Sequence, residues 1–318
     1  MTQEIWNKEK VEWVDIESTS FCNIDCPGCY RQVKRKKVNH ILDKDFLSFS
    51  NLKKWINKKH FPNLNLLNFC GSIDEPTLHP NMLDIVKYYN NEVDVNINIS
   101  SNGSTKTPDF WWKLGKEGIS VFFGIDGTDQ KSLEKYRVGS NFKKIRQNCK
   151  AFIDSGGRAV WQFIVFEHNE HLIEEARHMA NENGFEHFRL IYSHRSDNKE
   201  SKKKVRNEEH EIVCKYGNHK RIFLSHTGAL LPCCFFNSEY LQVYAGHDID
   251  TKFMKKYEEF GGPLAVNLKY NDPDEVMNGE LYDSVVESWK NKNTVMERCW
   301  NTCKKAKQDV FIDEELNA

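Results

Sequence analysis

Short apolar runs alternate with longer amphipathic segments across the first two thirds of this sequence, and this alternation most limits its fold. The apolar runs predict strands at residues 13–18, 64–70, 94–100, 120–126, 160–166 and 187–192. The amphipathic segments predict helices at residues 45–59, 81–90, 108–118, 142–155 and 169–183. Strands and helices that alternate at this spacing form a parallel sheet with right-handed crossovers.

The helix boundaries carry signals that agree with this prediction. Pro108 suits a first helical turn, and Gly118, Gly156 and Gly184 suit C-terminal caps. Six strand–helix units are too few for a complete eight-stranded barrel. We therefore expect an α/β fold built on an open, partial (β/α)6 barrel, with its site at the carboxyl ends of the strands.

The pattern changes in the last third of the chain. Residues 193–211 are almost entirely polar and predict a linker or surface loop. Five cysteines follow, together with strand-like runs at 221–225 and 229–232 and a helix around 281–300. We expect an N-terminal extension at 1–12, a partial barrel at 13–204 and a small second domain at 205–318.

Composition argues against several classes of protein. The chain has 318 residues and a formal net charge of −1, so no overall positive field favours nucleic acid or an acidic membrane surface. The first ten residues lack the apolar core of a signal peptide. No apolar stretch approaches the ~18–20 residues that a membrane-spanning helix needs. Ten cysteines in a cytoplasmic chain indicate metal ligands or catalytic thiols rather than disulfides.

A cysteine motif follows the first predicted strand directly. Cys22, Cys26 and Cys29 form a C-x3-C-x2-C pattern. Thiolates are soft ligands that suit iron–sulfur clusters, and three of them leave one iron of a cubane open for a cosubstrate. A zinc site would normally show C-x2-C pairs that close a tetrahedron, and a redox C-x-x-C pair would leave Cys22 unexplained.

This loop resembles the signature of the radical SAM superfamily. The resemblance implies that the three cysteines hold a [4Fe–4S] cluster whose open iron chelates S-adenosylmethionine (SAM). It also implies an external one-electron reductant such as flavodoxin or ferredoxin, cleavage of SAM to a 5′-deoxyadenosyl radical, and hydrogen abstraction from a small-molecule or peptide substrate. The family often has an aromatic residue before the third cysteine, where this chain has Gly28, with Tyr30 following.

Residues 71–80 resemble the family's G-G-x-G-E-P-x-x-x-P stretch, which binds the SAM amino group. Gly71, Ser72, Asp74 and Glu75 are the candidate SAM-binding residues here. Glu75 is the expected acceptor because a carboxylate suits an ammonium group. Ser72 and Asp74 replace common glycines, so the backbone path can differ. The alternative is an ordinary strand–loop–helix turn capped by polar residues.

Later strand ends supply the remaining candidates for the SAM pocket. Asn102 lies in a Ser-Asn-Gly turn that resembles a family motif, although Asn-Gly is also a common turn pair. Asp126 matches the aspartate of the family's S-x-D-G motif, in which this chain has Gly124 instead of serine. Arg137 suits the SAM carboxylate, with a surface arginine as the alternative. Gln162 is a polar residue among apolar neighbours and needs a partner.

A second set of four cysteines follows in the C-terminal third: Cys214, Cys233, Cys299 and Cys303. It resembles the twitch domain, the shortened relative of the SPASM domain, which implies one auxiliary [4Fe–4S] cluster. A structural zinc site closed by the same thiolates is the alternative. Cys234 directly follows Cys233 and is expected to be spare as a ligand.

Two further cysteines are candidates for catalysis. Some radical SAM epimerases use a cysteine as the hydrogen donor to a substrate radical, and Cys70 or Cys234 suits this role, with core packing as the alternative. Cys149 lies in a predicted helix and is expected to be a buried small apolar residue.

The favoured reaction is a two-electron oxidation of a small polar metabolite, because an auxiliary cluster can accept the electron left on a substrate radical. Only residues 1–12 precede the first strand, which weighs against a leader-peptide-binding domain. The alternatives are a peptide-modifying maturase, acting as an epimerase or crosslinker, and a non-catalytic zinc or iron–sulfur binding protein.

Overall fold

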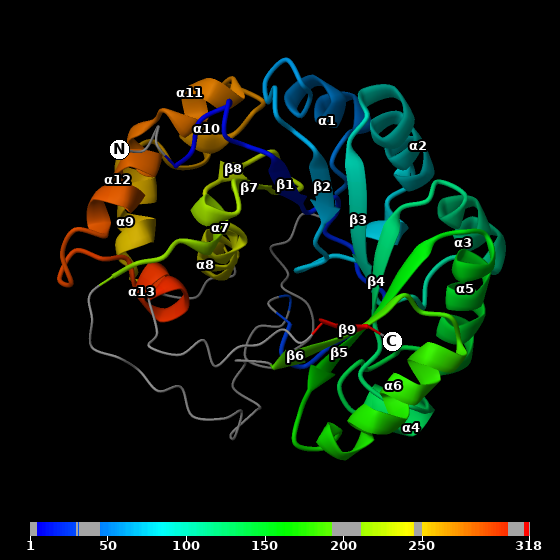
Figure 1. Cartoon of the computed structure of the whole chain (residues 1–318). Helices are drawn as coiled ribbons and strands as arrows, with labels where there is room; N and C mark the ends of the chain where they lie inside the picture. The colour runs from blue at the N-terminus through cyan, green and yellow to red at the C-terminus, as the bar shows by residue number, and fades with distance from the viewer. Residues whose placement is uncertain are drawn as a thin grey trace.

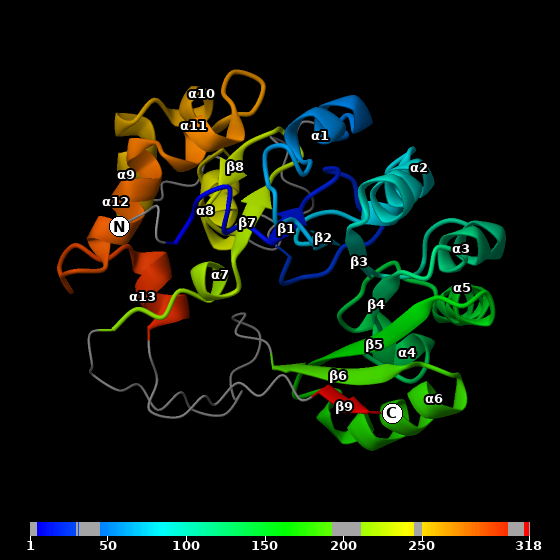
Figure 2. The same cartoon turned by 45° about the horizontal axis from the view of Figure 1, so that its top comes forward.

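A computed structural model of the chain describes residues 5–29, 31, 45–192, 211–244, 250–304 and 315–317. Within these residues one sheet runs in the order β8-β7-β1-β2-β3-β4-β5-β6-β9. Its first six strands are parallel: β1 (Trp13–Ile16), β2 (Leu66–Phe69), β3 (Asn96–Ser101), β4 (Ser120–Gly124), β5 (Arg158–Val165) and β6 (His187–Tyr192). The sheet curves without closing, with helices outside it (Figures 1 and 2). The predicted partial barrel is confirmed.

Six helices belong to the barrel: α1 (Phe49–Trp55), α2 (Met82–Lys87), α3 (Pro108–Gly115), α4 (Gln130–Glu134), α5 (Phe142–Asp154) and α6 (Ile173–Glu182). Five of them lie where helices were predicted, and α4 lies where none was predicted. Short helical turns lie at Pro76–Leu78, Tyr88–Val93 and Glu170–Leu172. Helix α5 shows why they pack outward, since Ile145, Cys149 and Phe152 share one buried face. The predicted burial of Cys149 is confirmed.

Glycines end three of these segments as predicted. Gly118, Gly156 and Gly184 have φ values of +66°, +100° and +77°. These left-handed conformations cost glycine little and other residues more, which explains the sequence at these caps.

The inner face of the barrel carries a band of polar side chains. Strand register places Asp15 beside Asn68, Asn68 beside Asn98, and Asn98 beside Ser120. Asn68 Nδ2 donates to Asp15 Oδ1 at 2.6 Å. A polar inner band of this kind suits a ligand cavity rather than a dry core.

The C-terminal third begins by extending the main sheet. Strand β7 (Arg221–Leu224) pairs in parallel with β1, and β8 (Leu230–Leu231) forms a hairpin with β7. Helices gather beyond this edge in Figure 1: α7 (Lys215–Asn218), α8 (Cys234–Tyr244), α9 (Lys252–Glu259), α10 (Gly262–Val266), α11 (Pro273–Met277), α12 (Glu280–Ser288) and α13 (Glu297–Cys303). Strand β9 (Glu315–Asn317) adds antiparallel to β6.

Two predicted helices differ in extent. The helix predicted at 45–59 spans only Phe49–Trp55, because residue 46 instead bridges to residue 19. The helix predicted around 281–300 is two helices, α12 and α13. Between them the chain turns, and the Thr294 hydroxyl donates to the carbonyl oxygens of Ser288 and Asn291.

Three predictions concern residues outside the described ranges. Tyr30 and the polar linker, apart from Glu211, lie outside them, as does the boundary between 204 and 205. The domain limits therefore stay predictions. None of the described helices combines the length and apolar character needed to cross a bilayer.

Candidate functional site

The cysteine motif forms a loop immediately after β1. The Cys29 N–H donates to the Cys26 carbonyl at 3.1 Å and closes a turn. Neighbouring loops hold this turn in place, since Asn23 Nδ2 donates to Ser104 Oγ at 2.9 Å and the Asp25 N–H donates to the Val138 carbonyl at 2.9 Å. The loop is therefore fixed to the segments that follow β3 and β4.

The thiols of this loop face the predicted SAM-binding segments. Cys22, Cys26 and Cys29 form no disulfide and are partly exposed. The Cys29 sulfur lies 3.9 Å from the Ser72 carbonyl oxygen, and Asn102 Nδ2 lies 4.0 Å from the Cys22 sulfur. Burial, followed by the Glu75 carboxylate, raises the pKa of Cys22 to about 12. The loops after β2 and β3 thus meet at the sulfurs, as a cluster with a bound cosubstrate requires.

Glu75 is engaged within the protein on both carboxylate oxygens. Its Oε1 accepts hydrogen bonds from the Thr77 hydroxyl at 2.6 Å and the Ser101 hydroxyl at 2.7 Å. Its Oε2 accepts from the Asn102 N–H at 2.7 Å. Burial raises the pKa of Glu75, and the hydrogen bonds from these donors lower it by less, so the pKa lies above its usual value. The geometry makes Glu75 a link between the loops after β2 and β3, and leaves little of the carboxylate for a ligand.

Asp74 keeps one oxygen available. Its Oδ2 accepts from the Ser18 N–H at 3.0 Å, the Ser18 hydroxyl at 3.1 Å and the Thr19 N–H at 3.2 Å. Its Oδ1 is buried and has no hydrogen-bond partner among the described residues. A buried acceptor without a donor is costly, so this oxygen is suited to a ligand that brings N–H groups.

Asn102 and Gly71 shape the loop ends. The Asn102 side chain donates to Asn23 Oδ1 at 2.9 Å and accepts from the Ser104 hydroxyl at 2.7 Å, so it ties the turn after β3 to the cysteine loop. Gly71 has a φ of +59°, and a Cβ there would lie 2.9 Å from the Ser100 carbonyl oxygen. Only glycine fits this close approach without strain.

Asp126 and Arg137 form a buried ion pair beside the cysteine loop. Arg137 Nε donates to Asp126 Oδ2 at 2.7 Å, and Asp126 Oδ1 accepts from the Ile164 N–H at 2.8 Å. Burial alone would lower the pKa of Arg137, but Asp126 and the nearby Cys26 raise it, so the guanidinium stays charged. The predicted surface-arginine alternative is wrong, because only 11% of this side chain is exposed.

Gly124 and Gln162 lie side by side on β4 and β5. A Cβ on Gly124 would stand 2.4 Å from Arg137 Nη2. The guanidinium therefore fills the space that the family's serine side chain would need. Gln162, which pairs with Gly124 in the sheet, is half-buried.

Glu17 lies in this region, and sequence analysis missed it. Its fully buried carboxylate accepts a hydrogen bond from the Ser72 hydroxyl and another from Asn237 Nδ2 at 3.0 Å. Burial, and then the Asp74 carboxylate, raise its pKa to about 8. The available signal was an acidic residue at the end of a strand predicted to be buried. Glu17 connects the loop after β2 with helix α8.

Cys70 and Cys234 lie within electrostatic range of each other. Cys70 Sγ is 3.6 Å from the Ile16 carbonyl oxygen, and the Tyr216 hydroxyl is within hydrogen-bonding reach of Cys234. Burial raises the pKa of Cys70 well above its usual range and that of Cys234 to about 12. Burial therefore favours the neutral thiol at both positions, which is the form that donates a hydrogen atom.

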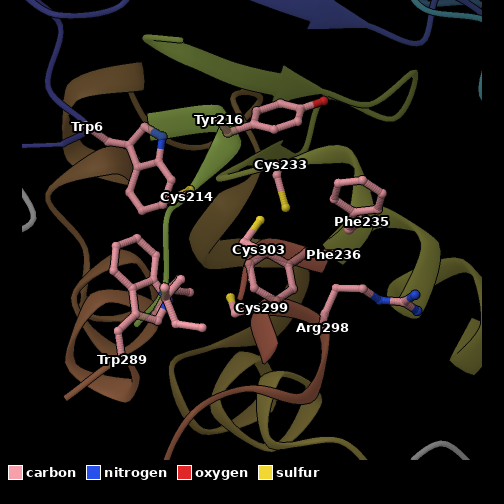
Figure 3. Close-up of a pocket in the computed structure, with 12 residues that line it drawn as sticks. Trp6, Cys214, Tyr216, Cys233, Phe235, Phe236, Trp289, Arg298, Cys299 and Cys303 are labelled. Atoms are coloured by element: carbon pink, nitrogen blue, oxygen red, sulfur yellow. The ribbon is translucent and has the colours of Figure 1, made fainter. Parts of the chain in front are cut away.

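The second cysteine set surrounds one pocket. Cys214 caps α7, Cys233 precedes α8, and Cys299 and Cys303 lie on α13. Figure 3 shows these thiols around the centre of the pocket, which measures about 340 Å³ with its open mouth. Aromatic side chains form much of its wall: Trp6, Tyr216, Phe235, Phe236 and Trp289.

The described residues contain no group of three or more His, Cys, Asp or Glu side chains placed to hold one metal ion. A structural zinc requires sulfurs that converge to about 2.3 Å from a common point. A cubane binds each sulfur to a different iron and so suits thiols spread around a pocket. Four thiols in an apolar pocket are a donor set that either group accepts, so the choice between an auxiliary cluster and a zinc ion stays a prediction.

Sequence comparison adds two findings. The family model described as "Radical SAM superfamily" matches residues 16–172. A curated protein of Pyrococcus furiosus, the "tungsten-containing aldehyde ferredoxin oxidoreductase cofactor-modifying protein", is 27% identical over 180 residues. That match covers 54% of this chain and 49% of the relative, so it spans about half the relative's length.

Structure comparison finds the same fold in solved proteins. Native anSMEcpe with bound AdoMet has a TM-score of 0.59 at 12% identity, covering 96% of this chain and 92% of that one. Streptococcus suis SuiB bound to S-adenosylmethionine has a TM-score of 0.57 at 13% identity, covering 91% and 77%. BtrN in complex with AdoMet and 2-DOIA has a TM-score of 0.50 at 13% identity, covering 96% and 98%.

Proposed function

Because this chain belongs to the radical SAM superfamily, and so uses a [4Fe–4S] cluster and SAM, we propose that it carries out a two-electron oxidation of a small polar molecule. When bound, the cluster and SAM supply a 5′-deoxyadenosyl radical. The observation that carries the proposal is the convergence of the loops after β1, β2 and β3 at the thiols of the cysteine loop. Cys22, Cys26 and Cys29 are the proposed ligands.

The protein's own residues would orient SAM through its charged ends. The Asp74 Oδ1 atom is a buried acceptor in need of a donor, which suits the ammonium group. Arg137, held by Asp126 near Cys26, supplies a positive charge for the carboxylate. Glu75 and Asn102 position these loops rather than bearing the main contact. Ser72 and Gln162 complete the proposed pocket wall.

The C-terminal cysteines are the proposed site of an auxiliary [4Fe–4S] cluster, within a twitch-like domain. A substrate radical must lose a second electron to become an oxidised product. The proposed ligand Cys233 is followed directly by Cys234, and Cys234 lies within electrostatic range of Cys70. This placement supports an oxidation.

The curated relative is named a cofactor-modifying protein. That description favours a small-molecule substrate over a peptide for this chain as well. The reaction would need an external one-electron donor such as flavodoxin or ferredoxin, and ten free cysteines suit a reducing cytoplasm.

A second candidate function is epimerisation of a peptide or other substrate. The neutral thiols of Cys70 and Cys234 favour it, because a thiol can return a hydrogen atom to a substrate radical. The S–H bond breaks, a C–H bond forms, and the resulting sulfur radical takes an electron from the external reductant and a proton from solvent.

Anaerobic reconstitution tests the proposal. Two cubanes require about eight irons per chain, and one requires about four. With SAM and dithionite, the protein should release 5′-deoxyadenosine, and the Cys26→Ala variant should not. Cys149→Ala is the matched control, because Cys149 is a buried core residue on helix α5 and is not a proposed ligand. Wild-type protein that leaves SAM intact would overturn the proposed function.

A further inference from the structure

A basic surface segment lies directly against the cysteine loop. Residues 130–146 hold six basic side chains and one acidic side chain, in a chain whose net charge is −1. Within this segment the Val138 carbonyl accepts a hydrogen bond from the Asp25 N–H at 2.9 Å. A Cβ on Gly139 would lie 3.8 Å from the Asn23 carbonyl oxygen, so the two backbones are close neighbours. Because Val138 is 40% exposed, a protein that covered it would lie next to the cysteine loop.

One glutamine side chain holds the two helices of this segment together at their N-termini. Gln130 Nε2 donates to the Ser140 carbonyl at 3.0 Å, and Gln130 Oε1 accepts from the Phe142 N–H at 2.8 Å. Gln130 is the first residue of α4 and Phe142 is the first residue of α5, so the lysines of both helices belong to one surface. Three lysines of this surface are exposed and the last is half-buried: Lys131, Lys135, Lys143 and Lys144.

The two lysines of α5 oppose the electrostatic preference of a helix. A helix N-terminus carries partial positive charge and favours acidic residues. Helix α4 follows this rule with Asp129 as its N-cap, whereas α5 has no acidic residue in its first turn. Farther along α5, Lys150 pairs with Asp154 at 2.8 Å, but no carboxylate of the described residues lies within 4 Å of the ammonium groups of Lys143 and Lys144. Helix stability therefore does not account for the positive charge at the end of α5 nearest the cysteine loop.

We propose that this surface docks the external electron donor, a small acidic one-electron carrier protein of the flavodoxin or ferredoxin type. Opposite charges on the two partners speed their encounter, and transient electron-transfer complexes bury little area, which suits four lysines around one exposed valine. One electron leaves the reduced carrier and enters the cluster at the cysteine loop. The carrier is thereby oxidised and the cluster reduced by one electron, and no bond forms or breaks. This inference rests on the proposed use of an external reductant.

Charge reversal at the start of α5 tests the docking surface in the reconstituted full-length chain. The variant combines Lys143→Glu with Lys144→Glu. Acidic residues at a helix N-terminus are favourable, so this variant should fold at least as well as the wild type. Release of 5′-deoxyadenosine driven by reduced flavodoxin at low ionic strength should fall about tenfold or more, because the steering charge is reversed. Release driven by dithionite should equal that of the wild type, since a small reductant needs no docking surface.

A matched control reverses two charges at the opposite edge of the sheet. Lys54 and Lys59 are exposed and precede β2, and their neighbour Lys58 donates from Nζ to the Asp94 carbonyl just before β3. They therefore lie at the amino ends of the strands, whereas the cysteine loop follows the carboxyl end of β1. Figures 1 and 2 also show α1 far from α4 along the row of barrel helices. Lys54→Glu with Lys59→Glu changes the net charge equally and should keep the wild-type rate with flavodoxin.

A binding measurement separates the inference from its premise. Calorimetric titration with oxidised flavodoxin, and with a ferredoxin, should give a Kd about tenfold weaker for the variant at 143 and 144 than for the wild type and the control, and added salt should narrow the difference. Equal Kd values for both carriers overturn the docking surface. A parallel fall of the dithionite-driven rate also overturns it, because the lysines would then act on another step. A wild-type chain that leaves SAM intact with either reductant overturns the proposed function, and the titration still decides where the carrier binds.

Discussion

The guanidinium of Arg137 occupies the space that a side chain on Gly124 would fill. Its Nη2 lies 2.4 Å from the position of a Cβ on residue 124, while its Nε bonds Asp126 at 2.7 Å. The glycine in place of the serine of the S-x-D-G motif and the buried arginine therefore depend on each other. Residue 124 gives up its side chain, and Arg137 brings a charged group to the same place.

This relationship predicts a coupled pair of substitutions. Gly124→Ser should displace Arg137 and weaken SAM binding about tenfold or more, because 1.4 kcal/mol of lost interaction is already tenfold. Arg137→Ala should weaken it similarly. In the Arg137→Ala background, Gly124→Ser should add little, which a double-mutant cycle by calorimetric SAM titration measures. Additive losses would show that the two residues act separately.

Amide substitution should affect Asp74 and Glu75 differently: it should lower stability at Glu75 and SAM affinity at Asp74. Glu75→Gln turns an amide N–H₂ toward buried donors, so it should lower the free energy of unfolding by about 1–3 kcal/mol. Asp74→Asn can keep an oxygen toward Ser18 and should lose SAM affinity with little loss of stability. Urea unfolding and SAM titration of both variants check this. Normal SAM binding by Asp74→Asn would contradict the role of Oδ1.

Glu17 should make the protein less stable as pH rises. Its pKa is raised to about 8 in the folded chain, so the folded state keeps a proton that the unfolded state releases above about pH 4.5. The groups that face it are Asp74, Arg31, Ser72 and Asn237. Its contribution is present below pH 4.5 and is lost between pH 4.5 and 8, with a slope near 1.4 kcal/mol per pH unit at most.

Chemical denaturation at pH 5, 6, 7 and 8 measures this slope. Glu17→Gln should flatten the dependence, since the amide carries no titrating proton. The exposed Asp109→Asn variant is the control and should keep the wild-type slope. Identical slopes in wild type and Glu17→Gln would mean that Glu17 is ionised in the folded protein.

Cys70 and Cys234 distinguish the two candidate reactions. If the enzyme oxidises its substrate, Cys70→Ala and Cys234→Ala should each retain product formation and differ mainly in stability. If it epimerises, one of them should lose turnover more than a hundredfold, as expected for the loss of a group that takes part directly in the chemistry. Mass spectrometry in deuterated water reads the result. Solvent deuterium in the product indicates epimerisation, and a net loss of two hydrogens indicates oxidation.

The barrel could be predicted well because its signals are local. Apolar runs, Pro108 and the capping glycines each report on a few neighbouring residues. Helices α4 and α7 to α11 were not predicted. Four of these, α4, α7, α10 and α11, have only four or five residues each, which is too short for their apolar residues to show a helical period. The pairing of β7 with β1 joins residues about two hundred positions apart, and no local pattern encodes it.

The sequence indicated which residues belong to the site, but not the hydrogen bonds that their individual atoms make. Sequence patterns located Glu75 and Asp126 at strand ends, where the structure also has them. They could not show that internal donors occupy both oxygens of each carboxylate. Glu17 was missed because its importance comes from a partner distant in sequence, Asn237.

Strand β1 is paired on both sides, by β2 and by β7, over the same four residues. A chain cut in the polar segment before residue 211 would leave the Trp13–Ile16 edge with open backbone donors and acceptors. Such an edge invites self-association. The barrel half alone should therefore aggregate, and the loop bearing Cys22 should lose its rigid support even though every residue of that loop is still present.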